Sequence, residues 1–294
     1  MTVFTNAIGF GLVTAAILSL SAVALSLQYG VTNIPNFSHG AFLTVAAYTA
    51  YMMQKVTSNL FVDALIGGLV GALLGYVINR FVIRSFNRQG TRLVIVFIVT
   101  IGISIIVQNT IALFFGNQAQ ALHLPIEKAR HLGPFVWTGP EIIIMLVALG
   151  FMALTHALLR YTKFGKAQRA VSDDVSLAQV AGINAERIVS ITWMLAGFMA
   201  GISGVVLAVD TGSFVPTTGF FFLLPTFAVV IVGGIGSAYG AMVGSLIIGL
   251  ATEIAAPYIN ASYKEVIAFG ILAAFLLLRP QGIFKTSEGR AQLQ

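Results

Sequence analysis

Apolar runs long enough to cross a lipid bilayer occupy most of this chain of 294 residues. Hydrophobic residues make up 57% of the sequence and charged residues only 9%, whereas a soluble domain has roughly a quarter charged residues. A transmembrane β-barrel is excluded because the runs are too long for its strands and do not alternate between apolar and polar residues. The sequence therefore predicts an all-α polytopic membrane protein with about eight or nine transmembrane helices, some of them broken or short.

Six apolar runs are predicted to be membrane spans: 5–27, 60–82, 93–115, 140–159, 188–209 and 264–278. Another run, 41–54, is short for a full span. Residues 220–255 are also apolar, but the stretch GGIGSAYG at 233–240 interrupts them, which favours two short spans or a re-entrant hairpin over one long helix. The whole chain, 1–294, is predicted to form a single transmembrane domain.

Glycines and amides inside these spans indicate how the helices pack. Two spans carry small-residue packing faces, formed by Gly67, Gly71 and Gly75 on one and by Gly197, Gly201 and Gly204 on the other. Tight packing is also favoured over a transport pathway for the glycines of the later interruption, which are Gly233, Gly234 and Gly236. Gln108 and Asn109 are interpreted as hydrogen-bond partners for neighbouring helices.

The longest polar interval, 160–187 (RYTKFGKAQRAVSDDVSLAQVAGINAER), lies between two of the predicted spans. It predicts a short helix, because Ser172 or Asp173 can cap the N-terminus and Asp174 suits the positive end of the helix dipole. Gly182 can end this helix, and Asn184 can cap the span that follows. The interval thus presents a short helix between two membrane helices.

Basic residues assign the sides of the membrane. The segments 80–92, 160–187 and 279–294 hold 12 of the 16 Lys and Arg residues. Because cytoplasmic loops are enriched in Lys and Arg, these segments and the C-terminus are predicted to be cytoplasmic. The formal charge of +6 is therefore interpreted as an orientation signal, and no nucleic-acid partner is expected.

A polar stretch, QYGVTNIPNFSHG at 28–40, interrupts the apolar sequence after the first span. Pro35 lacks a backbone donor and disfavours a helical conformation at the residue before it, so a helix through this stretch should break or kink. Broken helices with polar groups mark pathways in many transporters. The candidate pathway residues are Asn33, Asn36, Ser38 and His39. An ordinary turn between two spans is the alternative interpretation.

Sequence motifs give no support for catalysis or for a bound cofactor. The chain has no cysteine, its four histidines are scattered, and GKAQ at 165–168 lacks the leading Gly and the Ser or Thr of a phosphate-binding loop. No metal site, cofactor or ATPase activity of its own is expected. An ion-coupled secondary transporter of small polar solutes is the alternative class, but it needs buried carboxylates, and Glu253 is the one fair candidate.

Three stretches of the sequence resemble one family of membrane proteins. YGVTNIPNFSHGAFLTVAAYTA, the loop TKFGKAQRAVSDDVSLAQVAGINAERI, and VIVGGIGSAYGAMVGSLIIG with the terminal RPQGIF are similar, in this order, to the permease subunits of branched-chain amino acid ABC importers. The sequence departs from the family pattern at Ala46-Ala47-Tyr48, where Gly-Ala-Tyr is common, and at Ser38, where Ala is common.

This resemblance implies a function and a set of partners. The chain would be an inner-membrane permease that moves branched-chain or related amino acids by alternating access, paired with a second permease subunit of a different sequence. Two cytoplasmic ATP-binding subunits and a solute-binding protein would complete the importer. The short helix of the polar interval would dock on an ATP-binding subunit, with Asp173, Asp174, Ala178 and Gly182 as coupling residues. Ala178 and Gly182 are four residues apart, which would put them on one helical face.

Overall fold

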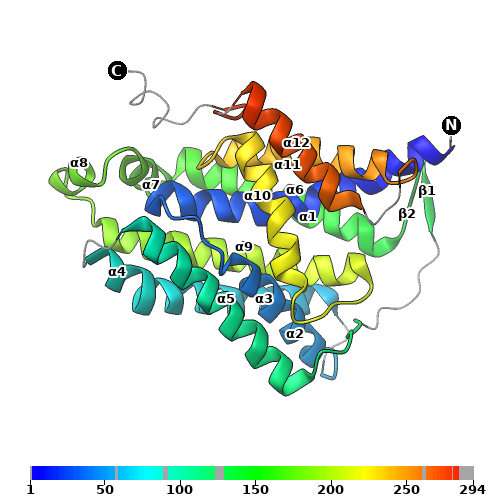
Figure 1. Ribbon diagram of the computed structural model, residues 1–294, viewed down its shortest axis with the longest axis horizontal. Helices are drawn as coiled ribbons and strands as arrows, with labels where there is room; N and C mark the ends of the chain where they lie inside the picture. Colours follow the sequence, from blue (N-terminus) through cyan, green and yellow to red (C-terminus); the bar gives the residue numbers. More distant parts are fainter. Residues whose placement is uncertain are drawn as a thin grey trace. The chain divides into compact units, whose positions relative to one another are not determined.

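The computed structural model describes residues 2–56, 59–88, 92–122, 129–259, 263–279 and 281–284. Within these ranges the chain is almost entirely helical (Figure 1), which confirms the all-α prediction. The elements are α1 (Thr2–Thr32), α2 (His39–Met53), α3 (Leu60–Ile78), the π-helical η1 (Asn79–Ile83), α4 (Arg84–Arg88), α5 (Leu93–Phe115), an antiparallel hairpin of β1 (Arg130–Leu132) and β2 (Phe135–Trp137), α6 (Gly139–Tyr161), α7 (Lys163–Asp173), α8 (Val175–Val180), α9 (Ala185–Thr211), α10 (Thr218–Gly233), α11 (Ala238–Ala255) and α12 (Lys264–Leu278).

Six helices in the described part of the chain are long and apolar enough to span a membrane. They are α1, α3 with its continuation to Phe86, α5, α6, α9 and α11. The predicted span 93–115 coincides with α5. The predicted span 264–278 has the same bounds as α12, but this helix has 15 residues and is not among the six. The apolar run 220–255 is divided into α10 and α11, as the glycine interruption predicts. The protein is therefore a polytopic helical membrane protein that contains short helices beside full-length ones.

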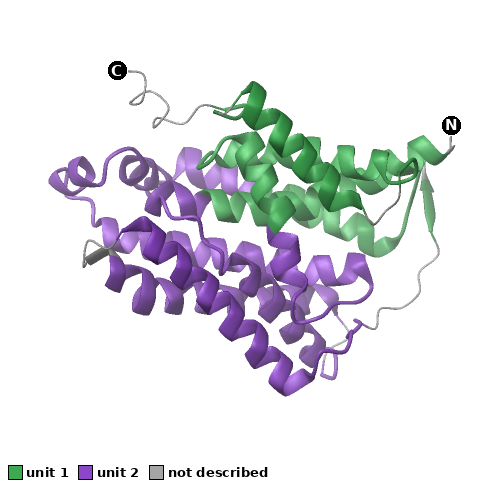
Figure 2. Cartoon of the chain, in the orientation of Figure 1, with its two compact units in different colours: residues 1–26, 123–152, 224–294 green, residues 27–122, 153–223 purple. Residues whose placement is uncertain are grey.

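The chain forms two compact units (Figure 2). Unit 1 comprises residues 1–26, 123–152 and 224–294, and unit 2 comprises residues 27–122 and 153–223. Each unit is assembled from segments that are distant in the sequence. Three helices, α1, α6 and α10, contribute residues to both units.

Close helix contacts in unit 1 depend on glycines. Gly233, the last residue of α10, and Gly240, near the start of α11, are so close that a Cβ on either would overlap the carbonyl oxygen of the other. Gly234 and Gly236 have φ angles of 110° and 81°, which side chains disfavour. Gly233 therefore allows α10 and α11 to approach closely, whereas Gly234 and Gly236 adopt the backbone angles of the turn between the two helices.

The segment after α12 completes the end of α10. The last carbonyl groups of a helix have no partner within the helix. In unit 1 the backbone N–H groups of Ile283 and Phe284 donate to the carbonyl oxygens of Val232 and Gly233, over 2.9 and 3.0 Å. The terminal RPQGIF motif thus supplies the hydrogen bonds that α10 lacks.

The core of unit 2 is built by α2, α3 and α9. A Cβ on Gly75 of α3 would lie 2.5 Å from the Trp193 carbonyl oxygen of α9, and one on Gly201 would lie 2.5 Å from the Gly67 carbonyl oxygen. Gly71 and Gly197 approach each other equally closely. These contacts confirm the packing faces predicted from glycine spacing, since two helix backbones touch only where side chains are absent.

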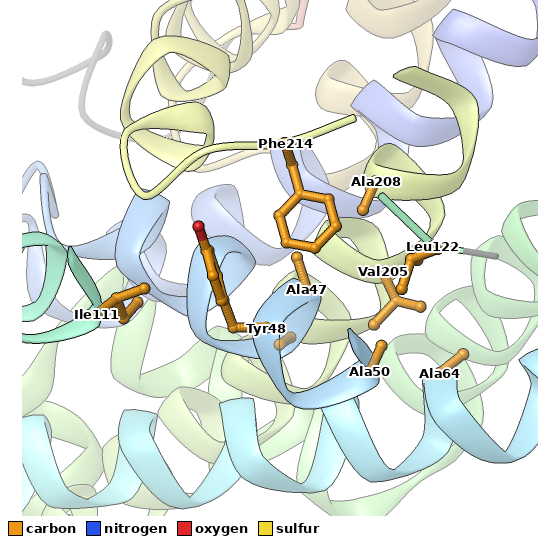
Figure 3. Packing of buried hydrophobic residues seen from close by; sticks show 10 residues of the cluster. Ala47, Tyr48, Ala50, Ala64, Ile111, Leu122, Val205, Ala208 and Phe214 are labelled. Carbon is orange, nitrogen blue, oxygen red and sulfur yellow. The ribbon is translucent and has the colours of Figure 1, made fainter. Parts of the chain in front are cut away.

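Three aromatic rings pack together beside this core. The Tyr48 ring on α2 lies 4.9 Å from the Phe115 ring at the end of α5 and 5.1 Å from the Phe214 ring that follows α9. Small residues of α2, including Ala47 and Ala50, pack beside them (Figure 3). Gln120 and Phe214 also exchange backbone hydrogen bonds of 2.9 and 2.8 Å. The chain segments 116–122 and 210–217 are therefore neighbours.

The α3–α9 contact predicts a sharp difference between two Gly→Ala substitutions. Gly71→Ala should destabilise the protein by about 1–3 kcal/mol, because its methyl group overlaps the Gly197 backbone. Gly102→Ala on α5, where a Cβ meets nothing within 4 Å, should be neutral or stabilising by about 0.5–1 kcal/mol through helix propensity. Unfolding in detergent micelles measures both. Equal stability of the two variants would contradict the packing described.

Candidate functional site

The predicted helix break is present in unit 2. Helix α1 ends at Thr32, and Asn33 has a φ of 53°, in the left-handed region that Asn tolerates better than most residues. Residues 33–36 have no regular structure, and α2 begins at His39. Thr100 of α5 accepts a hydrogen bond of 3.2 Å from the Phe37 backbone N–H. The backbone that follows the end of α1 is thus hydrogen-bonded to α5.

Four fully buried polar side chains surround this break, and we call them the break cluster: Gln28, Asn36, Ser38 and His39. Asn36 Oδ1 accepts hydrogen bonds from the Ser38 backbone N–H (3.0 Å) and from Ser38 Oγ (2.6 Å). Asn36 Nδ2 donates to Gln28 Oε1 over 3.0 Å, and His39 Nδ1 lies 3.4 Å from the same oxygen. The cluster therefore joins the end of α1 to the start of α2 through side chains.

Three of the four candidate pathway residues come together here, and one does not. Asn36, Ser38 and His39 belong to the break cluster, whereas the Asn33 side chain is exposed. Gln28 was missed as a candidate. Its one sequence signal is an amide at the end of an apolar span, and no spacing rule connects it to Asn36 across a break.

Helix α5 carries four polar residues in the stretch 100–109, and one of them, Thr100, contacts the break. Thr100 and Ser104 are buried, and Gln108 Nε2 donates to Ser104 Oγ over 3.0 Å. The prediction that Gln108 and Asn109 bond to other helices is wrong, because Asn109 Nδ2 donates to the Ile105 carbonyl within α5. Hydrogen bonding along a helix satisfies these groups without a partner helix.

The polar interval 160–187 folds into two short helices, α7 and α8. Thr162 caps α7, since its hydroxyl accepts from the Gly165 backbone N–H at 3.0 Å. The cap of α8 is Asp174, not Ser172 or Asp173 as predicted, because α7 extends through Asp173.

Asp174 holds the first turn of α8. Its Oδ1 accepts from Ser176 Oγ (2.6 Å) and from the backbone N–H groups of Ser176 (2.8 Å) and Leu177 (3.0 Å). These hydrogen bonds, with that from the Ser176 hydroxyl the largest, hold the pKa of the Asp174 carboxyl below its ordinary value. The carboxylate is therefore charged at neutral pH.

Gly182 ends α8 as predicted. It has a φ of 83°, its N–H donates to the Gln179 carbonyl, and the Ile183 N–H donates to the Ala178 carbonyl over 2.9 Å. This pair of bonds is the Schellman arrangement of helix ends. Asn184 then caps α9, also as predicted. Gly182 lies beyond the last residue of α8, so it does not share a helical face with Ala178.

The two faces of α8 differ in exposure. Ala178 is only 3% exposed and belongs to a buried cluster, the inner contact, which consists of Val31, Val171, Ala178 and Ala185. Leu177 and Val180 are 67% and 87% exposed. Ala178, predicted as a coupling residue of the docking helix, is therefore covered by other residues of this chain and is not free to dock, and the most exposed apolar side chains of α8 are Leu177 and Val180.

Both basic segments of unit 2 meet on one side. Arg84, which follows the π-helical turn after α3, forms an ion pair with Glu186 at the start of α9. Close by, Asn79 Nδ2 donates to Ser190 Oγ over 3.0 Å. The ion pair connects the segments 80–92 and 160–187, which the charge distribution assigns to the same side.

Glu253, the one carboxylate considered for ion coupling, is paired in unit 1. Its Oε1 lies 2.6 Å from Lys264 Nζ and accepts a hydrogen bond of 2.9 Å from Thr14 Oγ1. The side chain of Glu253 is 12% exposed. Its charge is therefore already neutralised by a side chain of the same unit.

Comparison with known proteins identifies the family. A model of the family described as "Branched-chain amino acid transport system / permease component" matches residues 7–276. The "High-affinity branched-chain amino acid transport system permease protein LivH" of Escherichia coli (strain K12) is 30% identical over 293 residues, covering 95% of this chain and 94% of the relative. BraD of Pseudomonas aeruginosa, a permease protein of the same description, is 29% identical over 292 residues and covers 95% and 94%.

A third relative has a similar match. The "Probable branched-chain amino acid transport permease protein LivH" of Methanocaldococcus jannaschii is 29% identical over 283 residues, covering 91% of this chain and 88% of the relative. No solved structure matches the chain significantly. With its apolar helices, its broken first span and a family match along nearly its whole length, the chain belongs to the permease components of branched-chain amino acid transport systems.

Proposed function

We propose that this protein is one of two membrane-spanning subunits of an ABC importer that moves branched-chain or related amino acids across the inner membrane of a prokaryote. The observation that carries this proposal is the similarity, over 95% of the chain, to permeases named for that transport. The partners are a second permease subunit of different sequence, two cytoplasmic ATP-binding subunits and a solute-binding protein. The permease itself hydrolyses no ATP, in keeping with a sequence that lacks a phosphate-binding loop.

In this proposal the break cluster lies on the solute pathway. Uncharged amide, hydroxyl and imidazole groups at an interrupted helix are typical of binding sites in transporters. Asn33 would lie at the rim of this region and Asn36, Ser38 and His39 within it. Glu253 supports ATP-driven transport over ion coupling, because its pairing with Lys264 leaves it poorly suited to bind a transported ion.

The coupling of ATP hydrolysis to the pathway would run through α8. Its exposed residues Leu177 and Val180 would dock on an ATP-binding subunit, while Asp174 and Gly182 fix the two ends of the helix. On its other side, Ala178 belongs to the inner contact with Val31. Val31 lies two residues before Asn33, where α1 breaks. A displacement of α8 would therefore reach the break through packed side chains.

The orientation follows from this arrangement. Docking of α8 on a cytoplasmic subunit would put the interval 160–187 in the cytoplasm, and the ion pair between Arg84 and Glu186 supports the same side for the segment 80–92. Both agree with the distribution of Lys and Arg. The basic C-terminal segment would also be cytoplasmic.

The energy source can be tested with purified components. Proteoliposomes that contain this permease, its partner permease and the ATP-binding subunits should accumulate leucine, isoleucine or valine when ATP and loaded binding protein are supplied. The permease subunits alone should accumulate none under a proton or sodium gradient. Uptake driven by an ion gradient without the ATP-binding subunits would contradict the proposal.

The docking role of α8 predicts a loss of coupling without a loss of folding. Leu177→Asp with Val180→Asp should abolish ATP-driven uptake and the stimulation of ATPase activity by loaded binding protein, because charged groups replace an apolar docking surface. The permease should remain inserted and stable, since both side chains are exposed. Val56→Asp, which alters a residue 77% exposed in the turn after α2, is the matched control and should transport normally. Normal uptake by the double variant would remove α8 from the coupling path.

A further inference from the structure

A single backbone amide fixes the direction of every hydrogen bond in the break cluster. The Ser38 N–H can only donate, so the Asn36 atom 3.0 Å away is the oxygen Oδ1. Asn36 Nδ2 therefore points to Gln28, and the Gln28 atom that it contacts must be the acceptor Oε1. The Gln28 carboxamide is thus held with its oxygen toward Asn36.

The orientation of Gln28 in turn determines the role of His39. Its Nδ1 lies 3.4 Å from Gln28 Oε1. Because a carboxamide oxygen only accepts, Nδ1 must carry the hydrogen in this contact. Gln28 Oε1 thus accepts from two donors. If the Gln28 nitrogen took the place of this oxygen, two donors, Gln28 Nε2 and Asn36 Nδ2, would face each other.

The Gln28 nitrogen is left without a partner. Gln28 is fully buried, and its Nε2, which carries two N–H groups, has no hydrogen-bond acceptor among the described residues. Buried donors in native proteins are nearly always paired, and an exception indicates a place where water or a ligand binds. The Gln28 oxygen is held by Asn36 and His39, and these two contacts fix the direction in which the two N–H groups point.

We propose that the Gln28 carboxamide nitrogen binds the α-carboxylate of the transported amino acid. This inference rests on the proposed function. Two N–H donors on one nitrogen suit an anionic oxygen, and a hydrogen bond to a charged acceptor is stronger than one to a neutral acceptor. The break cluster contains no Asp or Glu that could bind the ammonium group instead. Asn36 and His39 act as positioning residues, because they hold Gln28 by its oxygen.

The site is closed in this conformation, since Gln28 is fully buried. The solute would reach it when the backbone at 33–36, which is not part of a helix, rearranges during the transport cycle. Because the inner contact includes Val31, between Gln28 and the break, movement of α8 would act on this same stretch.

Gln28→Glu separates binding from structure, because it keeps an oxygen for Asn36 and His39 and removes the NH2 group. Equilibrium binding of radiolabelled leucine to the purified complex, without binding protein and in each nucleotide state, is the measurement. The Kd of the tightest state should rise tenfold or more in Gln28→Glu. The control Thr155→Val removes another buried polar group of unit 2 and should leave the Kd unchanged.

A second measurement compares two ligands. Leucinamide, which lacks the carboxylate, should compete with leucine at least tenfold less well on the wild-type complex, and Gln28→Glu should reduce this preference. Equal competition by leucinamide, an unchanged Kd in Gln28→Glu, or no saturable leucine binding in any state would overturn the inference and would indicate bound water only. None of these results decides the proposed function, which is tested separately by ATP-driven uptake of branched-chain amino acids into proteoliposomes with the wild-type importer.

Discussion

A backbone that leaves its helix in apolar surroundings must find new hydrogen-bond partners, and this constraint organises the region from Gln28 to His39. Pro35 prevents α1 from continuing, so the groups of the break turn to side chains: Thr100 accepts from the Phe37 N–H, and Asn36 accepts from the Ser38 N–H. Once that bond orients the Asn36 amide, the amide orientation of Gln28 and the protonated nitrogen of His39 are determined as well. The polar character of the break is thus a requirement of folding, and the same groups are available to a solute.

The break is also the point at which α8 can influence the rest of unit 2. The inner contact joins α8 and α7 to the end of α1 at Val31, and to the start of α9 at Ala185. Helix α9 in turn is held against α3 by glycine contacts that leave no space for side chains. A tightly packed interface transmits displacement because it cannot absorb it by compression. A rigid helix pair beside an interrupted helix suits a permease that is driven by separate ATP-binding subunits.

Much of this fold could be predicted because its signals are local. Polar residues bound the apolar run of α5, Pro35 marks the break, and four-residue glycine spacing marks the α3 contact face. The features that could not be predicted depend on distant parts of the chain. Whether Asp173 or Asp174 caps α8 depends on where α7 ends, and the burial of Ala178 depends on Val31 of another helix. Gln28 gains its role only when the break folds Asn36 back against α1.

The central claim is that the break cluster opens to the solute pathway during the ATP cycle, and the reactivity of one engineered cysteine tests it most directly. The chain has no natural cysteine, so Ser38→Cys supplies a single thiol of nearly unchanged size at a fully buried position. In the complete importer this thiol should resist small aqueous thiol reagents in one nucleotide state and react in another, whereas Ser203→Cys, buried in α9, should resist them in every state. An equal rate at position 38 in all nucleotide states would contradict the account.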